Sequence, residues 1–467
     1  MYWIWIFRNL KLNNKIKTLR EKSKTPFTPL TRAGTGKTYA SDFAVRSYEP
    51  KRILFLVHRE QIAKQAMASY KRVFGKNTSM GVLSGNEKSY EADFLFSTMQ
   101  TMAKQEIREL FSPNGFQMIV VDEAHRIGSP SYQAIMDYFQ PEFWLGMTAS
   151  PERTDGFDVY QAFDHNIAYE IRLQKALEED LLCPFHYFGI TDFVIDDETI
   201  TDEKDFAQFN RLTSDVRVDY VIEKAEYFGY SGSRVKGLIF CSSKKEAIVL
   251  SEKFNERGYE TLALSGDDSQ EKREKAIEKL VSEDLDNKLD YIFTVDIFNE
   301  GVDIPDVNQV LLLRPTQSPI VFVQQLGRGL RKAEDKEYVV IIDFIGNYTN
   351  NFLIPIALSG DRSYNKDTLR KYMMEGNKEI PECSSIHFDS ISKERIFKSI
   401  NEIKGLKRII RESYKNLKYK LGRVPRLIDF YENGEVDPLL ILNEYKTYHA
   451  FLENVEESYS ANALNEK

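Results

Sequence analysis

The stretch Met118-Ile119-Val120-Val121-Asp122-Glu123-Ala124-His125 decides the fold, because four apolar residues, three of them β-branched, run directly into two carboxylates. This pattern is typical of a buried central strand of a parallel sheet that ends in acidic side chains. Open α/β sheets bind ligands at that carboxyl edge. Two adjacent acids there suit a magnesium nucleotide, with Asp122 holding the metal and Glu123 orienting or deprotonating a water. The alternative, a strand that ends in a solvated acidic turn, is disfavoured by the sequence on either side.

A phosphate-binding loop is predicted upstream, at Gly34-Thr35-Gly36-Lys37-Thr38, followed by apolar residues at helical spacing. Glycines let backbone N–H groups approach phosphates, and the N-terminus of the following helix adds positive potential. Lys37 would reach the β- and γ-phosphates of ATP, and Thr38 would ligate Mg²⁺. The general loop pattern has its first glycine where this chain has Thr31, so the motif is incomplete. Together with an Asp-Glu strand further along the chain, it still indicates a nucleotide site.

Further strands of the same sheet are predicted at residues 52–57, 93–97 and 143–147. They end in His58-Arg59-Glu60-Gln61, in Thr98-Met99-Gln100-Thr101 and in Thr148-Ala149-Ser150-Pro151. Since the carboxyl ends of parallel strands meet at one edge, these polar residues would lie beside the two acids, where a nucleic-acid backbone can be held. The alternative for each is an ordinary strand-to-helix cap, where Ser and Thr are favoured anyway.

A second alternating series follows, with strands predicted at residues 236–241, 259–264, 291–295, 310–313 and 338–342 and helices at 244–254, 271–280 and 320–330. The alternation implies another parallel sheet with helices on both faces. In the last of these helices Arg328 and Arg331 share one face, and Gln324 lies one turn before Arg328. Two arginines presented to ATP would act as fingers on the γ-phosphate. The alternative is a surface helix with solvated arginines.

The composition bounds the class of protein. The 467 residues suffice for about three domains, and the net charge of −8 gives no overall attraction to nucleic acid, so such binding must rely on local basic surface. Cys183, Cys241 and Cys383 are far apart and support neither a disulfide framework nor a zinc or iron–sulfur site, so a cytoplasmic location is expected. The apolar residues 1–7 precede the basic ones, the reverse of a signal peptide, and no stretch is long enough to span a membrane.

The motifs form one ordered set, in single letters GTGKT, HREQ, TMQT, DEAH, TASPER, FCSS, NEGVDIP and QQLGRGLR. This set resembles superfamily 2 helicases, and within them the DEAH-type group close to restriction-enzyme motor subunits and repair helicases. The resemblance covers residues 31–350. It implies two RecA-like α/β parallel-sheet domains in tandem, which hydrolyse ATP with Mg²⁺ in the cleft between them and ratchet along one nucleic-acid strand.

The resemblance also implies roles for individual residues. Lys37 and Thr38 match the phosphate and magnesium ligands, Asp122 the metal carboxylate and Glu123 the catalytic base of an ATP hydrolase. In the second domain the matches are two arginine fingers, Arg328 and Arg331, and the residue that helps to place the attacking water, Gln324. Residues that match contacts to the nucleic acid, or that couple it to the nucleotide, are Arg59, Thr98, Gln100, Thr148, Ser150, Thr294, Gly301 and Asp303.

Residues 343–348 and 354–361 resemble a narrower bacterial group. Its members often carry a phospholipase-D-like nuclease domain before the motor and an uncharacterised domain after it, and this chain has neither at full length. The resemblance implies nucleic acid as the partner, DNA in preference to RNA, with a nuclease or another defence or repair protein as a further candidate partner. An RNA helicase stays open as an alternative, since nothing in the motifs reads a 2′-hydroxyl.

Two departures from the family concern the N-terminus. Members have an apolar strand immediately before the phosphate loop, but here residues 25–32 contain Pro26 and Pro29, which cannot donate hydrogen bonds in a central strand. Members also commonly have a glutamine upstream that contacts adenine, but this chain has none before Gln61. A truncated or altered N-terminus would explain both. The further alternative is therefore a non-catalytic remnant that binds nucleic acid without hydrolysing ATP.

The sequence predicts five regions: an irregular basic arm (1–30), the first RecA-like domain (31–175), an acidic connecting segment (176–212), the second RecA-like domain (213–360) and a smaller, mainly helical C-terminal region (361–467). In the last region, residues 398–426 carry ten Lys and Arg against two Glu. This stretch is a candidate surface for phosphates, with Tyr414 and Tyr419 placed to stack on bases. The alternative is a solvated helix whose apolar face packs on the motor. The two can hold together because they use opposite faces.

Overall fold

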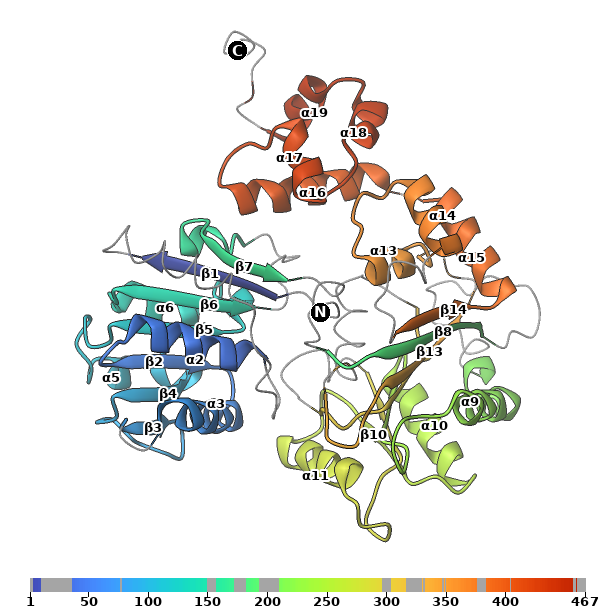
Figure 1. Cartoon of the computed structure of the whole chain (residues 1–467), viewed down its shortest axis with the longest axis horizontal. Coiled ribbons are helices and arrows are strands. Elements are labelled where there is room, and N and C mark those ends of the chain that lie inside the picture. Colours follow the sequence, from blue (N-terminus) through green and yellow to red (C-terminus); the bar gives the residue numbers. More distant parts are fainter. Residues whose placement is uncertain are drawn as a thin grey trace. The chain divides into compact units, whose positions relative to one another are not determined.

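The computed structural model describes residues 3–9, 36–75, 78–148, 157–171, 182–192, 210–295, 304–315, 330, 332–346, 348, 350–375, 384–403, 405–456 and 459. The chain divides into two compact units, Met1–Arg172 with Arg411–Asn433 (unit 1) and Leu173–Ile410 with Gly434–Lys467 (unit 2). Each unit contains a seven-stranded sheet (Figure 1). The predicted fold class, two parallel-sheet α/β domains with a helical C-terminal region, is confirmed.

The sheet of unit 1 has the strand order β3-β4-β2-β5-β6-β1-β7. Strands β2 to β6 are parallel to one another, and β5 lies in the middle of the sheet. All four strands predicted for this sheet are confirmed. The strand bounds are β1 (Trp3–Asn9), β2 (Ile53–Val57), β3 (Met80–Leu83), β4 (Phe94–Thr98), β5 (Met118–Asp122), β6 (Phe143–Thr148) and β7 (Ile167–Ile171).

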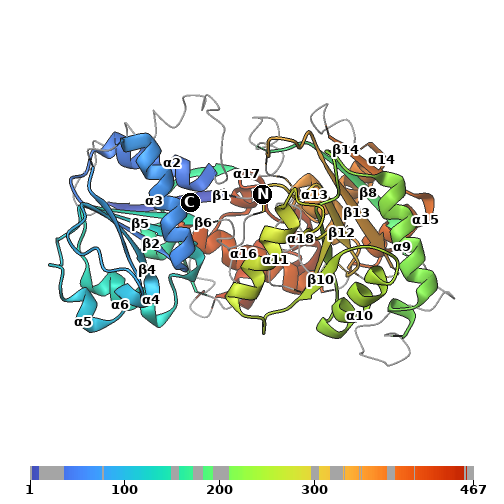
Figure 2. The same cartoon turned by 90° about the horizontal axis from the view of Figure 1, so that it is seen from below.

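Strand β5 is buried on both faces, which explains its uninterrupted apolar sequence. Met118 and Val120 belong to the core shared with α2 (Gly36–Tyr48) and α3 (Glu60–Phe74). Ile119 and Val121 belong to the core on the other face, with α6 (Pro130–Tyr138). Figure 2 shows these helices on opposite faces of the sheet. Because side chains alternate along a strand, all four positions must be apolar, and only the residue after them can be charged.

Strand β1 lies between β6 and β7 and is antiparallel to both. The sequence predicts residues 1–30 as an irregular arm, and for Trp3–Asn9 this prediction is wrong. The aromatic and β-branched residues at the start of the chain have high β propensity, but the basic residues after them dominate the composition of the segment. Ile4 faces Thr148 and Asn9 faces Phe143. The strand therefore runs away from the carboxyl edge, and it is not a strand that leads directly into the phosphate loop.

The sheet of unit 2 is entirely parallel, with the order β10-β11-β9-β12-β13-β8-β14. The five strands predicted for it are confirmed, as are two of the predicted helices, now α10 (Lys244–Asn255) and α11 (Gln270–Val281). Residues 320–329 of the helix predicted at 320–330 lie outside the described residues. The strand bounds are β8 (Phe185–Thr191), β9 (Gly237–Phe240), β10 (Thr261–Leu264), β11 (Tyr291–Thr294), β12 (Gln309–Leu312), β13 (Val339–Ile345) and β14 (Ser385–Phe388).

Two strands of this sheet come from segments that were predicted otherwise. Strand β8 lies in the predicted acidic connector, where no strand is predicted. Strand β14 lies in the C-terminal region, which is mainly helical as predicted. The many acids after residue 192 obscure the aromatic β8, and β14 is only four residues long. Pairing with β8 holds β14 in place. Gly189 in β8 makes room for it, because a Cβ there would lie 2.3 Å from Cδ1 of Phe388.

The remaining helices cover the sheets and form most of the C-terminal region. No helix among the described residues is both long and apolar enough to cross a membrane. The bounds are α4 (Met99–Met102), α5 (Gln105–Arg108), α9 (Asp215–Phe228), α13 (Leu353–Ser359), α14 (Lys366–Glu375), α15 (Ser390–Asn401), α16 (Leu406–Leu421), α17 (Leu427–Glu432), α18 (Pro438–Tyr445) and α19 (Tyr448–Val455).

A buried ion pair ties α9 to the end of β8 in unit 2. Arg217 donates two hydrogen bonds of 2.9 Å to the carboxylate of Asp192, and a third of 2.7 Å to the carbonyl of Leu212. Glu246 at the start of α10 lies 3.7 Å from the same guanidinium. All three charged side chains are at most 2% exposed. The single arginine therefore compensates two buried carboxylates, and burial still raises the pKa of Glu246.

Replacing Arg217 should therefore destabilise unit 2 strongly. We expect Arg217→Met to lower the free energy of unfolding by roughly 3–5 kcal/mol, because Asp192 and Glu246 are left buried without a cation. Urea unfolding followed by circular dichroism measures the loss. The matched control is Arg257→Met, since Arg257 bridges the exposed Asp215 and Asp219 and should contribute about 1 kcal/mol or less. Equal losses in the two variants would contradict the assignment.

Candidate functional site

The N-terminus of α2 lies at the carboxyl edge of the sheet in unit 1. Tyr48, the last residue of the helix, donates a hydrogen bond of 3.0 Å to Glu142 and stacks on Phe143, with ring centroids 5.5 Å apart. Because Phe143 is the first residue of β6, this end of α2 lies at the amino edge. The helix has 13 residues, so it is about 20 Å long, and the six residues of β6 span about the same length. Val45 packs in the core between helix and sheet, so α2 lies along the strands and its first turn reaches the opposite edge.

This placement brings the predicted phosphate loop to the edge where Asp122 lies. Gly36, Lys37 and Thr38 form the first turn of α2, for which the structure describes the backbone. The first N–H groups of a helix have no partners within it and, with the helix dipole, favour an anion at that end. Gly34 and Thr35 lie outside the described residues. The described part of the loop is thus oriented as phosphate binding requires.

Asp122 and Glu123 are fixed by contacts at the ends of β5 and β6. The backbone N–H of Glu123 donates to Oδ1 of Asp122 over 3.0 Å. Glu123 itself adopts the left-handed conformation, with φ 51° and ψ 49°, which costs on the order of 1 kcal/mol for a residue with a Cβ. Its Oε2 lies 3.3 Å from Nδ1 of His125, and that nitrogen lies 3.1 Å from Oγ1 of the buried Thr148. His125 therefore links the acidic turn to the end of β6.

A second set of contacts links the ends of β2 and β4 to the same turn. Nδ1 of His58 lies 3.3 Å from the amide of Gln100, and its Nε2 lies 3.4 Å from Arg126. The amide nitrogen of Gln100 and the guanidinium of Arg126 therefore lie against the two ring nitrogens of His58. Sequence reasoning missed the bridging role of His58 and Arg126; the position of His58 directly after a buried strand was the available signal.

The structure brings six predicted residues together at one edge. Besides Asp122, Glu123, Thr148 and Gln100, Thr98 ends β4 and donates to Oγ1 of Thr101 over 2.8 Å. The sixth, Arg59, is the N-cap residue of α3. In unit 2, Thr294 ends β11 at the carboxyl edge of that sheet and is fully buried. Besides Gly34 and Thr35, the predicted residues that lie outside the described part of the chain are Ser150, Gly301, Asp303, Gln324, Arg328 and Arg331.

The residues of unit 1 fit a nucleotide-bound magnesium ion. Among the described residues, no group of three or more His, Cys, Asp or Glu side chains could hold a metal by itself. Mg²⁺ in nucleotide sites takes one or two carboxylates and otherwise phosphate and water oxygens. Asp122 supplies such a carboxylate, held by the N–H of Glu123, at the edge to which the first turn of α2 points. Thr38 in that turn is of the residue type that ligates the ion in phosphate loops.

A buried carboxyl group lies behind this first turn. Asp42, one turn after Thr38 in α2, is completely buried, and Ser69 of α3 donates to its Oδ2 over 2.8 Å. Its Oδ1 has no hydrogen-bond partner among the described residues. Burial raises the pKa of Asp42 to about 7, although the bond from Ser69 acts in the opposite direction. The packing of α2 on α3 therefore includes an acid that resists ionisation.

Family models match parts of both units. The model described as "Type III restriction enzyme, res subunit" matches residues 10–153, and "Helicase conserved C-terminal domain" matches residues 221–333. A domain of unknown function, DUF8090, matches residues 410–467. The first two models agree with the resemblance that the motifs predict.

The chain is also similar to curated proteins. The putative ATP-dependent helicase IRC3 of Saccharomyces cerevisiae is 28% identical over 324 residues, which cover 66% of this chain and 45% of that protein. The Type I restriction enzyme EcoAI endonuclease subunit of Escherichia coli is 28% identical over 357 residues, 67% of this chain and 42% of the subunit. A DNA 3′-5′ translocase of Sulfurisphaera tokodaii is 24% identical, with 56% and 65% covered. The chain thus spans less than half the length of the first two proteins.

Solved structures share the fold. The Type ISP restriction-modification enzyme LlaBIII bound to DNA has a TM-score of 0.53 and 17% identity, covering 97% of this chain and 39% of that one. Saccharomyces cerevisiae Dbp5 bound to Gle1 and IP6 has a TM-score of 0.50 and 17% identity, with 80% and 87% covered. At these identities the likeness concerns the fold, and it confirms the prediction of two RecA-like domains.

The raised pKa of Asp42 makes the stability of unit 1 depend on pH. The folded pKa lies above the unfolded one, so the unfolded state releases its proton first, and stability falls as the pH rises from about 4 to 7. We expect Asp42→Asn to stabilise the protein at pH 8, by a gain that shrinks by about 1.4 kcal/mol for each pH unit from 7 down to 4. Thermal unfolding at several pH values measures this. Asp267→Asn, at an exposed carboxylate, is the control, and a gain that is constant across pH would contradict the assignment.

Proposed function

Because the chain belongs to the superfamily 2 helicases, in the group related to restriction-enzyme motor subunits, we propose that it is an ATP-driven translocase or helicase that acts on DNA. One observation carries the proposal. The first turn of α2, the acidic pair Asp122 and Glu123, and the nucleic-acid candidates Thr98 and Gln100 all lie at the carboxyl edge of one sheet. A nucleotide and a strand of nucleic acid would therefore bind to neighbouring parts of the same rigid element.

In the proposed hydrolysis, Glu123 takes a proton from the water that attacks the γ-phosphate. Its carboxylate is positioned by the strained left-handed turn and by His125, so little reorganisation is needed at the moment of reaction. The first turn of α2, with Lys37, holds the phosphates. Mg²⁺, when bound beside Asp122 and Thr38, neutralises charge on the phosphate oxygens. Arg328 and Arg331 of the second domain keep the role of arginine fingers, with Gln324 placing the water.

Coupling between ATP and nucleic acid would pass through the two histidines. Gln100 and Arg59 contact the strand backbone in this proposal, and His58 joins Gln100 to Arg126 in the acidic turn. His125 joins the same turn to Thr148, which begins the motif that continues to Ser150. A shift of Gln100 on binding nucleic acid would therefore displace Arg126 and, through the short turn, the carboxylate of Glu123. His58 acts here as a positioning residue.

DNA is favoured as the substrate because two of the similar proteins are named as a DNA translocase and a restriction-enzyme subunit. A cytoplasmic location and work beside a nuclease or another defence or repair protein belong to the same proposal. The second candidate function is a remnant that binds nucleic acid without hydrolysing ATP. One observation favours it: β1 runs antiparallel and ends at the amino edge, so it does not deliver the chain to the phosphate loop as a preceding parallel strand would.

The steady-state rate of ATP hydrolysis, with and without single-stranded DNA, tests the proposal. We expect a rate that DNA stimulates and that Glu123→Gln lowers by about 10²- to 10⁴-fold, since the general base is lost. The exposed Glu91→Gln in the same unit is the matched control and should keep the rate. Wild-type protein that is folded but no faster than Glu123→Gln would support the remnant instead. Full activity in Glu123→Gln would overturn the role of this residue.

The coupling route has its own test. We expect His58→Ala to lower the ratio of DNA-stimulated to basal hydrolysis by about tenfold, the equivalent of one lost hydrogen bond to a charged group. The KM for ATP should change little, because His58 does not contact the nucleotide. A double-mutant cycle with Gln100→Ala distinguishes a shared route from separate effects. In a shared route the double variant is no worse than the more impaired single variant, and additive losses would count against the bridge.

A further inference from the structure

Helix α16 (Leu406–Leu421) has one buried face and one basic face. Ile410, Tyr414 and Leu417 are at most 3% exposed and lie on one side of the helix. The neighbouring sector of the helix, between Tyr414 and Tyr419, carries Lys407, Arg408, Arg411, Lys415 and Lys418, which we call the basic stripe. The first four are exposed and Lys418 is half-buried. The two interpretations of this segment, a phosphate-binding surface and a packed amphipathic helix, are compatible, because the buried side chains and the cations occupy different sectors of the helix.

The aromatic part of the sequence prediction is wrong for Tyr414. Tyr414 is 3% exposed and stacks on Phe430, with ring centroids 6.4 Å apart. Tyr419 packs against the hydrophobic core of unit 1. Tyr414 therefore cannot stack on a base, and Tyr419 is partly buried by its contact with this core. Any contact made by the exposed face is therefore electrostatic.

The geometry of the stripe matches a linear polyanion. Lys407, Arg411 and Lys415 follow one another at intervals of four residues, and Arg408 and Lys418 lie within the same sector of the helix. From Lys407 to Lys418 the helix rises about 16 Å at 1.5 Å per residue. Measured along the axis of duplex DNA, one strand carries a phosphate about every 3.4 Å. An axial length equal to the stripe therefore contains roughly five phosphates, as many as the stripe has cations. The helix contains a single acid, Glu412.

The far end of the helix is anchored within unit 1. Nδ1 of His165 lies 2.5 Å from the carbonyl oxygen of Tyr419 and donates to it. Gly422, with φ +65°, closes the helix directly against this imidazole, where a Cβ would lie 2.6 Å from Cδ2 of His165. The basic stripe therefore sits on a fixed element, and its side chains lose less freedom on binding than those of a loop would.

We propose that the basic stripe of α16 is a second nucleic-acid contact, which binds the phosphate backbone without reading sequence. The proposal rests on the proposed function, because it assumes that this family member acts on nucleic acid. It gives a role to part of the segment matched by DUF8090. In a chain of net charge −8, only such a local concentration of cations can attract a phosphate backbone. An acidic protein segment has no fixed spacing of charge, so the regular stripe favours nucleic acid.

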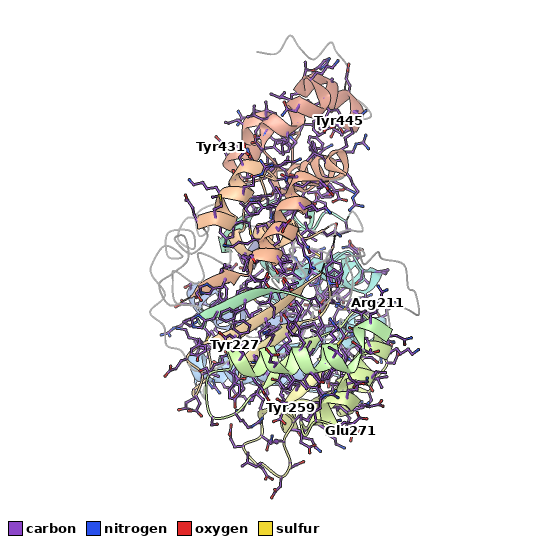
Figure 3. The ribbon with its side chains drawn as sticks, turned by 90° about the vertical axis from the view of Figure 1, so that its right-hand side faces the viewer. Arg211, Tyr227, Tyr259, Glu271, Tyr431 and Tyr445 are labelled. Atoms are coloured by element: carbon purple, nitrogen blue, oxygen red, sulfur yellow. The ribbon has the colours of Figure 1, made fainter. Side chains whose placement is uncertain are left out.

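Helix α11 is a second helix with several lysines, but it contains nearly as many acids as cations. Lys272, Lys275 and Lys279 alternate there with Glu271, Glu274 and Glu278, and Lys275 pairs with Glu271 at 2.7 Å. Figure 3 labels Glu271 on this helix. Helix α11 carries four cations and three acids, whereas α16 carries six cations and one acid. The two helices thus offer a test variant and a control with the same change of net charge.

The experiment compares Lys407→Gln/Arg411→Gln/Lys415→Gln with Lys272→Gln/Lys275→Gln/Lys279→Gln in the full chain. The affinity for a 30-nucleotide oligothymidine is measured by fluorescence anisotropy as a function of salt. Loss of three phosphate contacts should reduce the slope of log K against log salt by about 2, and weaken binding about 100-fold at 0.1 M salt. Arg411→Gln alone should reduce the slope by about 0.7. The α11 variant should bind as the wild type does.

The outcomes separate this proposal from the proposed function. Wild-type protein that binds the oligonucleotide, with an unchanged slope in both α16 variants, would overturn the second contact alone and leave an acidic protein partner for the stripe. Equal losses in the α16 and α11 triple variants would also overturn it, since net charge would then be the cause. Wild-type protein that binds no nucleic acid at low salt would overturn both proposals.

Discussion

The structure of unit 1 depends on the burial of β5 from both sides. Helices α2 and α3 cover Met118 and Val120, and α6 covers Ile119 and Val121, so no polar side chain can be placed before the end of the strand. Each of these apolar side chains contributes roughly 1.5–3 kcal/mol by burial. The first position free of this constraint is Asp122. The same packing that stabilises the sheet therefore fixes where its chemistry can occur, and it lays α2 along the strands with its first turn at that edge.

Ion pairing, as well as apolar packing, organises unit 2. Its sheet is parallel throughout, but the ends of β8 and the start of α10 are joined by Arg217 between two buried carboxylates. Such a group stabilises little compared with apolar residues of the same shape, yet it is costly to break. The group of three charged side chains lies at the carboxyl edge of the sheet. Open α/β sheets bind ligands at this edge, so polar residues are expected there. Asp343, within β13, is another buried acid of unit 2: burial raises its pKa to about 7, and Tyr187 donates to it.

The sequence predicts the central strands well because burial on both faces leaves an unbroken apolar run. It fails for β1, β8 and β14, whose partners lie far away in the chain: β1 pairs with β6 and β7, and β14 pairs with β8. No local pattern encodes such pairing.

The positions of Asp122, Glu123 and Thr148 at one edge follow from strand order, so motifs sufficed to group them. The contacts of His58 with Gln100 and Arg126 join three different strand ends, and only the folded chain brings them together. The predicted stacking of Tyr414 on a base is wrong because an aromatic residue in a basic segment can stack equally well on a base or on a protein ring.

Charge arrangement matters more than charge number in this protein. The chain is acidic overall, yet its two helices with the most cations differ in composition: α11 has four cations and three acids, and α16 has six cations and one acid. In water the field of a paired Lys and Glu falls off within a Debye length of about 10 Å at 0.1 M salt. Cations in one row reinforce each other over the same distance, so a nearby polyanion meets an attractive surface despite the net charge of −8. Tyr414 and Tyr419 lie on the two sides of that row, and their packing holds the helix in place. Packing in the core thus decides where the basic stripe of α16 lies.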